Sequence, residues 1–120
     1  MKLLSAIHRA EQAAAGLFAD YVGIDVTVRQ AAILEALKAA PSVSQSALTV
    51  LTGVDRSTLA EMIRRMQRKG WVERRRNRSD ARAYVVNLTR EGSKVLMAAQ
   101  TAAAKAEKEL RGRIPGVQQL

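Results

Sequence analysis

Arginine is the residue type in this chain with the clearest capacity for chemistry, and its side chains are concentrated in one stretch. Residues 55–92 carry eleven Lys or Arg against five Asp or Glu, a net charge of +6 out of a total of +9. Residues 1–54 are neutral overall, and residues 93–120 contribute +3. A guanidinium binds phosphate groups and guanine edges through paired hydrogen bonds. This excess predicts a polyanionic partner, and nucleic acid is the class it favours.

The first group of cations lies on a predicted helix over residues 56–69, whose apolar residues follow the spacing i, i+3, i+4, i+7. Asp55 is a good N-cap for this helix, and Gly70 is placed to end it. A helix end with hydroxyls and Arg can enter the major groove of DNA, whereas the alternative is a solvated helix face. The inward residues are Leu59, Met62, Ile63 and Met66. The candidates for DNA contact are Arg56, Ser57, Thr58, Glu61, Arg64, Arg65 and Arg68.

The second group of cations lies on a predicted β-hairpin. Residues 71–74 and 84–88 are strand-like, and the stretch 75–82 between them is polar and rich in turn residues. Its arginines outnumber the nearby carboxylates, which suits a phosphate backbone or a narrow minor groove. The alternative is a soluble hairpin that protects its own edges. The five cations are Arg74, Arg75, Arg76, Arg78 and Arg82, and the candidates for DNA contact are Arg75, Arg76, Arg78, Asp80 and Arg82.

Four predicted helices precede the hairpin, and two of them form a helix-turn-helix. A helix over residues 3–21 ends at Gly23, and a capping box at Thr27 starts a second helix that stops before Pro41. Ser44 caps a short third helix that runs through Leu51, with Leu48 and Leu51 facing inward. The tight turn at residues 53–54 then joins this helix to the helix at 56–69.

A final Ala-rich helix is predicted from a cap at Thr89 to about Arg111, and its small side chains would let another helix approach closely. The apolar positions of the first and last helices cannot all be covered within one protomer, so we expect a homodimer. Phe18 and Tyr21 could instead line a small-molecule pocket, but packing at the dimer interface is the favoured interpretation. The candidate dimerisation residues are Leu3, Leu4, Ile7, Leu17, Phe18, Tyr21, Leu96, Ala99 and Ala103.

Composition excludes several other classes. The chain has no Cys, so disulfides, thiolate zinc sites and thiol redox chemistry are ruled out, and its single His disfavours a His-based metal site. There is no paired-carboxylate constellation and no phosphate-cradling Gly-rich loop, so we expect neither an enzyme nor a cofactor or metal. No apolar run is long enough to span a membrane, and charges at Arg9 and Glu11 interrupt any signal-peptide core. A cytoplasmic protein is predicted.

Taken in order, these segments resemble the MarR family of winged helix-turn-helix transcriptional regulators. The matching stretches are 23–30, 54–59, 65–74, 79–83 and 86–92, which together cover about residues 23–95. The predicted fold is therefore mainly α with a small β-hairpin. It is a single winged-helix domain over 1–120, with a DNA-binding core at about 23–92 and dimerisation helices at 1–22 and 93–120.

The resemblance implies a dimer that binds a pseudo-palindromic operator in double-stranded DNA, with repression as the favoured outcome. It also implies that a small-molecule effector could release the dimer from the operator. The helix at 56–69 would be the recognition helix and the hairpin the wing. Within the wing, Arg82 would lie at the minor groove and Asp80 would order the loop. The family usually continues into a further C-terminal helix, so this chain is expected to have a reduced dimerisation region. The alternative function is a winged-helix module for protein interaction, such as an anti-activator, although it would leave the wing arginines without a role.

Overall fold

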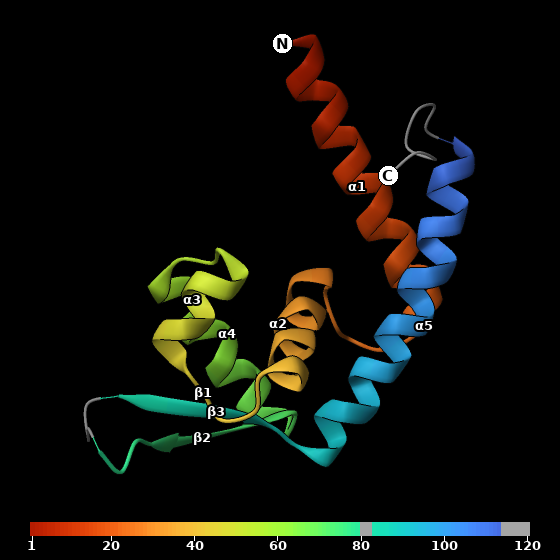
Figure 1. Ribbon diagram of the computed structural model, residues 1–120. Coiled ribbons are helices and arrows are strands. Elements are labelled where there is room, and N and C mark those ends of the chain that lie inside the picture. Colours follow the sequence, from red (N-terminus) through yellow and green to blue (C-terminus); the bar gives the residue numbers. More distant parts are fainter. Residues whose placement is uncertain (80–82, 114–120) are drawn as a thin grey trace. The chain divides into compact units, whose positions relative to one another are not determined.

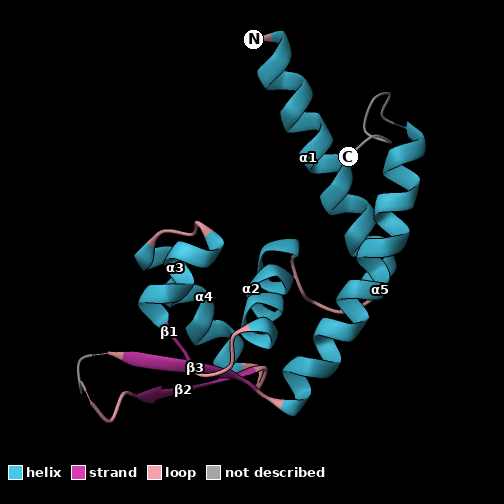
Figure 2. Ribbon diagram, viewed as in Figure 1, coloured by secondary structure: helices cyan, strands magenta, loops and turns pink. Residues whose placement is uncertain are grey.

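The computed structural model describes residues 1–79 and 83–113, and it is mainly helical with one small antiparallel sheet (Figures 1 and 2). The fold class predicted from the sequence is confirmed. In chain order the elements are α1 (Lys2–Val22), α2 (Val28–Ala39), β1 (Val43–Ser44), α3 (Gln45–Thr52), α4 (Arg56–Arg68), β2 (Val72–Arg76), β3 (Tyr84–Leu88) and α5 (Arg90–Arg113). None of the described helices is long and apolar enough to cross a membrane.

The chain divides into two compact units. One contains residues 29–97, and the other contains residues 1–28 together with the C-terminal part of the chain from residue 98. Helix α5 contributes to both units, because its first turns belong to the former and its remaining turns to the latter.

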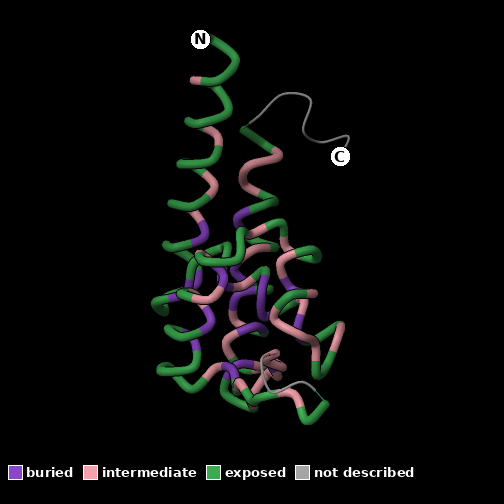
Figure 3. The backbone as a smooth tube through the Cα atoms, turned by 90° about the vertical axis from the view of Figure 1, so that its left-hand side faces the viewer, coloured by how far each residue is buried: buried purple, intermediate pink, exposed green. Residues whose placement is uncertain are grey.

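The unit of residues 29–97 has a continuous apolar core between its helices and its sheet. Leu48 of α3 and Ile63 of α4 are fully buried there, as is Val86 of β3 (Figure 3 marks the buried segments in purple). Helix α4 buries the residues that its spacing predicted, apart from the partly buried Met62. The core residues are Ile33, Leu34, Leu37, Leu48, Leu59, Ile63, Met66, Val72, Val86 and Leu96.

Local capping sets the ends of the two helices of the helix-turn-helix as predicted. The Ser44 hydroxyl accepts a hydrogen bond from the Ala47 N–H at 3.0 Å, and the Asp55 carboxylate accepts one from the Thr58 N–H at 2.9 Å. Gly53 ends α3 with a φ of 71°, a left-handed conformation that costs glycine little. The prediction for Leu51 is wrong, since its side chain is exposed. The short helix turns Leu48 and the half-buried Thr52 toward the core, and Leu51, on the neighbouring flank of the helix, stays exposed.

The sheet has three strands in the order β1-β3-β2, whereas the sequence predicted a two-stranded hairpin. The additional strand β1 is only two residues long and pairs Val43 with Val86. The Ser42 N–H and hydroxyl both donate to the Asn87 Oδ1, at 2.7 and 2.9 Å, and so fix the entry to β1. Strand β2 is also longer than predicted, because residues 75 and 76 pair with β3 instead of lying in the loop.

The base of the hairpin is joined to the start of α5 by a compact set of hydrogen bonds. The Thr89 N–H donates to the Trp71 carbonyl at 3.1 Å, and the Thr89 hydroxyl donates to the Gly70 carbonyl at 2.6 Å. The same hydroxyl oxygen accepts from the Gly92 N–H at 3.0 Å, which confirms Thr89 as the cap of this helix. Trp71 packs against the core, as predicted for the root of the hairpin.

In the other unit, α1 lies beside the later turns of α5 within the same chain. The Tyr21 hydroxyl of α1 donates to the Glu109 carboxylate of α5 at 2.8 Å. This hydrogen bond, together with the charge of Glu109, raises the pKa of Tyr21 above its ordinary value. Phe18 of α1 is buried, and so are the α5 alanines at 99, 102 and 106.

These contacts correct part of the predicted dimer surface. Phe18, Leu96 and Ala99 were predicted as dimerisation residues, but all three are buried within one chain. The reason is that α5 is covered on its small-residue face by the chain itself, with Leu96 in the core of the 29–97 unit. The other dimerisation candidates keep some exposure: Leu17 and Ala103 are half-buried, and Leu3, Leu4, Ile7 and Tyr21 are exposed.

Candidate nucleic-acid interface

Helix α4 presents a polar face opposite its buried face, and this face carries Ser57, Glu61, Arg64 and Arg68, with Thr58 and Arg65 at its edge and Arg56 in the first turn of the helix. Of these seven predicted DNA-contact residues, six are exposed and Thr58 is half-buried. The Ser57 and Thr58 hydroxyls both donate to the Asp55 carboxylate, at 3.0 and 2.7 Å. The Thr58 N–H and these hydroxyls hold the pKa of Asp55 below its ordinary value, so the N-cap stays charged at neutral pH. These two hydroxyls therefore stabilise the N-terminus of α4.

Glu61 lies among the α4 arginines and partly neutralises them. Its carboxylate is 3.2 Å from the Arg64 guanidinium and 3.5 Å from that of Arg65. The hydrogen bond from Arg64 holds the pKa of Glu61 below its ordinary value. Because these side chains are about half exposed, the pairs are of the kind that contribute little to stability and exchange readily with other partners. Arg64 can therefore exchange Glu61 for another hydrogen-bond acceptor at low cost.

Other arginines of the predicted surface are not neutralised in this way. Arg56 at the start of α4, Arg68 near its end and Arg78 beyond β2 form no ion pair within residues 1–79 and 83–113. All three are exposed. A cation without a carboxylate partner retains its full charge for an incoming anion, so these positions suit a phosphate backbone.

The hairpin has two faces with different electrostatics. The register pairs Glu73 with Asn87 and Arg75 with Val85, so these residues share the face that points away from the helices. There the Arg75 Nε donates to the Glu73 carboxylate at 2.7 Å, and this bond partly neutralises the outer face.

The inner face of the hairpin is the face that Val72 and Val86 bury in the core. Arg74 pairs with Val86 and Arg76 pairs with Tyr84, so both arginines continue this face beyond the apolar residues. The guanidinium carbon of Arg74 lies 4.2 Å from the centre of the Tyr84 ring, and that of Arg76 lies 5.8 Å from it. Both distances are within the range of cation–π attraction.

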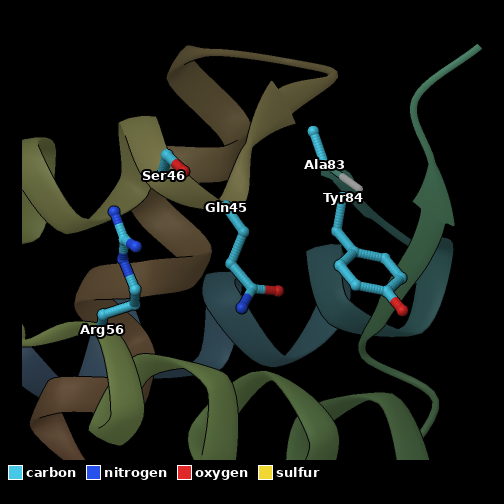
Figure 4. A pocket seen from close by; sticks show the side chains of 5 residues that line it. All are labelled: Gln45, Ser46, Arg56, Ala83 and Tyr84. Carbon is cyan, nitrogen blue, oxygen red and sulfur yellow. The ribbon is translucent and has the colours of Figure 1, made fainter. Parts of the chain in front are cut away.

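A shallow pocket of about 180 Å³ lies between this inner face and the first turns of α3 and α4 (Figure 4). Arg56 borders it on one side and Tyr84 on the other, with Gln45 between them. The Gln45 Oε1 is buried and has no hydrogen-bond partner among the described residues, although such an atom is usually paired with protein or water. Ser46 and Ala83 complete the lining. The pocket therefore combines the cation of Arg56 with polar groups at the N-termini of α3 and α4, where partial positive charge gathers.

The structure thus brings the α4 residues and the strand arginines into one 29–97 unit. Asp80 and Arg82, predicted for the wing tip, lie outside the described residues. Sequence reasoning missed Gln45 and Tyr84. A predicted strand that ran to residue 76 would have placed Tyr84 directly across from Arg76 and so indicated it.

Comparisons with known proteins show the family. A sequence model of the MarR family matches residues 24–83. The transcriptional regulator HosA of Escherichia coli O111:H- is 37% identical over 95 residues, which cover 79% of this chain and 70% of that protein. Such relatives are regulators of transcription and not enzymes, which confirms the prediction that the chain is not an enzyme.

Solved structures give the same result. The PcaV transcriptional regulator of Streptomyces coelicolor, in complex with its natural ligand, superposes with a TM-score of 0.87 at 30% identity, over 95% of this chain and 81% of that one. A mutant of MarR from E. coli complexed with operator DNA superposes with a TM-score of 0.85 at 27% identity, over 97% of this chain and 84% of that one. The chain belongs to the MarR family of DNA-binding transcription regulators.

Proposed function

We propose that this protein binds a pseudo-palindromic operator in double-stranded DNA as a homodimer and represses transcription from it. The observation that carries this proposal is the gathering of exposed arginines on α4 and the hairpin of one compact unit. In this proposal α4 enters the major groove, where Arg64 exchanges Glu61 for a base edge. Arg56 and Arg68 contact phosphates on either side of the groove, and the hairpin follows the backbone as the wing.

The proposed wing contact places Arg82 at the minor groove, with Asp80 ordering the loop. A narrow minor groove has an enhanced negative potential that attracts arginine. Support for this arrangement comes from the hairpin itself, whose inner face carries Arg74 and Arg76 toward the loop. The MarR mutant that is similar in fold was solved with operator DNA, which supports the same partner for this chain.

The proposed dimer uses the exposed apolar side chains at the start of α1. Leu3, Leu4 and Ile7 are each more than half exposed and lie at i, i+1 and i+4, on one side of the helix. A cluster of this kind on a helix is usually covered by another surface. A second copy of α1 is the proposed cover, and it would place two α4 helices to read two half-sites.

Light scattering tests the dimer. The expected mass is about twice the 13.1 kDa of one chain at tens of micromolar. Ile7→Glu should shift the protein toward the monomer, because it places a charge in the apolar contact. Gln12→Glu adds the same charge at another exposed position of α1 and should leave the mass unchanged. A clean monomer for the parent protein would contradict the proposal.

Selection from a pool of random duplexes tests the operator. Two recognition helices related by a two-fold axis should enrich inverted half-sites that lie about one helical turn, roughly 10 base pairs, apart. Enrichment of a single half-site, or of no sequence, would contradict binding as a symmetric dimer. Transcription from a promoter that carries the selected site should fall when the protein is present.

The proposal includes release from DNA by a small organic effector. Its support is the similarity to PcaV, which was solved in complex with its natural ligand. A screen of small aromatic and carboxylic acids against the protein bound to its selected operator tests it. At least one compound should lower the affinity for the operator, and a screen in which none does would remove the effector from the proposal.

A further inference from the structure

Tyr84 occupies a particular place on the inner face of the hairpin. This face is apolar where it covers the core at Val72 and Val86, and it becomes charged at Arg74 and Arg76. Tyr84 is the residue directly across from Arg76 and diagonal to Arg74. Its ring is half-buried, and one side of it borders the pocket that Arg56 lines (Figure 4).

Arg74 has an unusual environment for a half-buried arginine. Within residues 1–79 and 83–113 its guanidinium forms no ion pair, and it lies against the Tyr84 ring at 4.2 Å. Arg75, its neighbour on the outer face, is held by Glu73 instead. The ring thus orients Arg74 without cancelling its charge, because the negative face of an aromatic ring attracts a cation while carrying no net charge.

We propose that Tyr84 is a positioning residue for DNA binding. Its ring holds the Arg74 guanidinium, and more weakly that of Arg76, in place for phosphates of the operator backbone. The inference rests on the proposed function, because it describes how the wing arginines are oriented before they meet the operator DNA. The same Tyr84 side chain also lines the pocket that Arg56 borders.

The expected effect follows from the cost of ordering a long side chain. Fixing a flexible arginine at an interface costs free energy, and a residue that holds the arginine in advance removes part of that cost. Loss of the ring should therefore weaken operator binding by about two- to tenfold for the two arginines together. The slope of the salt dependence should stay unchanged, because the number of phosphates that are contacted is the same.

Two substitutions separate the ring from the rest of the side chain. Tyr84→Ile removes the ring but keeps a residue that favours strands, and it should show the two- to tenfold loss. Tyr84→Phe keeps the ring and removes the hydroxyl, so it should bind within about twofold of the parent. Both are compared with Val85→Ile, a control on the other face of the same strand.

A double-mutant cycle then tests whether the ring acts through the arginines. In a background with Arg74→Gln and Arg76→Gln, Tyr84→Ile should cause no further loss of affinity. The same loss in both backgrounds would overturn the proposal, since the ring would then contact DNA itself or support the fold. Equal binding of Tyr84→Ile and the parent would also overturn it. A parent that binds no duplex at all would refute the proposed function, and the inference with it.

A measurement on the free protein tests the geometry independently of DNA. The ring current of Tyr84 should move the NMR signals of the Arg74 side chain upfield in the parent and in Tyr84→Phe. Those signals should return to ordinary values in Tyr84→Ile. Ordinary Arg74 signals in the parent would overturn the proposal even if Tyr84→Ile proved too unstable for binding experiments.

Discussion

Gly92 lies where the base of the hairpin meets α5, and replacing it with Ala should destabilise the fold. A Cβ at this position would overlap the Trp71 carbonyl oxygen and would lie 2.8 Å from the Leu88 Cδ1. The first neighbour is backbone and cannot rotate away. That carbonyl also accepts the hydrogen bond from the Thr89 N–H, so relief of the clash must pull the start of α5 away from the hairpin.

The magnitude follows from three contributions. Forcing an extra carbon into a packed site costs about 1–3 kcal/mol. Weakening the hydrogen bond between Thr89 and Trp71 costs roughly a further 0.5–1.5 kcal/mol. The better helix propensity of Ala offsets about 0.5–1 kcal/mol. Gly92→Ala should therefore lower the free energy of unfolding by about 0.5–4 kcal/mol.

Urea denaturation followed by circular dichroism measures this change, with all proteins at one concentration. Gly16→Ala is the matched control, because Gly16 lies inside α1 and a Cβ added there would meet open space. This control should be more stable than the parent by up to about 1 kcal/mol. If Gly92→Ala is as stable as the parent, the contact between the hairpin base and α5 does not constrain the fold as described.

Two further predictions concern charge and pH. Glu61→Gln frees Arg64 from its ion pair and removes one negative charge from α4, so binding to random-sequence DNA at low salt should tighten in fluorescence anisotropy. Glu35→Gln makes the same charge change on α2 and should have less effect. The hydrogen bond to Glu109 raises the folded-state pKa of Tyr21 above its ordinary value of 10.0. The contribution of this hydrogen bond to stability is therefore complete below about pH 10 and is lost as the pH rises through the folded pKa. The difference in unfolding free energy between the parent and Tyr21→Phe should therefore shrink as the pH rises through and above 10.0, and a constant difference would contradict this role of the hydrogen bond.

Local sequence signals were enough to predict most of the elements. Ser44 and Asp55 cap helices because their short polar side chains reach the free N–H groups just ahead of them, and such contacts depend on neighbours in the sequence alone. The buried face of α4 likewise follows from its spacing. The helix-turn-helix and its basic surface could therefore be predicted from local patterns.

Features that depend on distant partners could not be predicted in this way. Strand β1 is only two residues long, which is too short to show an alternating pattern. It exists because Val43 pairs with Val86 of a distant strand. Arg76 belongs to a strand because Tyr84 lies across from it, although a run of arginines is typical of a loop. The sequence also does not determine which helix covers Ala99, because a small-residue face can pack against a helix of the same chain or of a second chain.

The central claim is that the basic surface of α4 and the hairpin faces nucleic acid. The most direct measurement is the affinity for a duplex of random sequence as a function of salt concentration, followed by fluorescence anisotropy. If each protomer of a dimer contacts about three to five phosphates, the plot of log K against log salt should have a slope of about −5 to −9. A slope near zero, or no binding at low salt, would contradict the account.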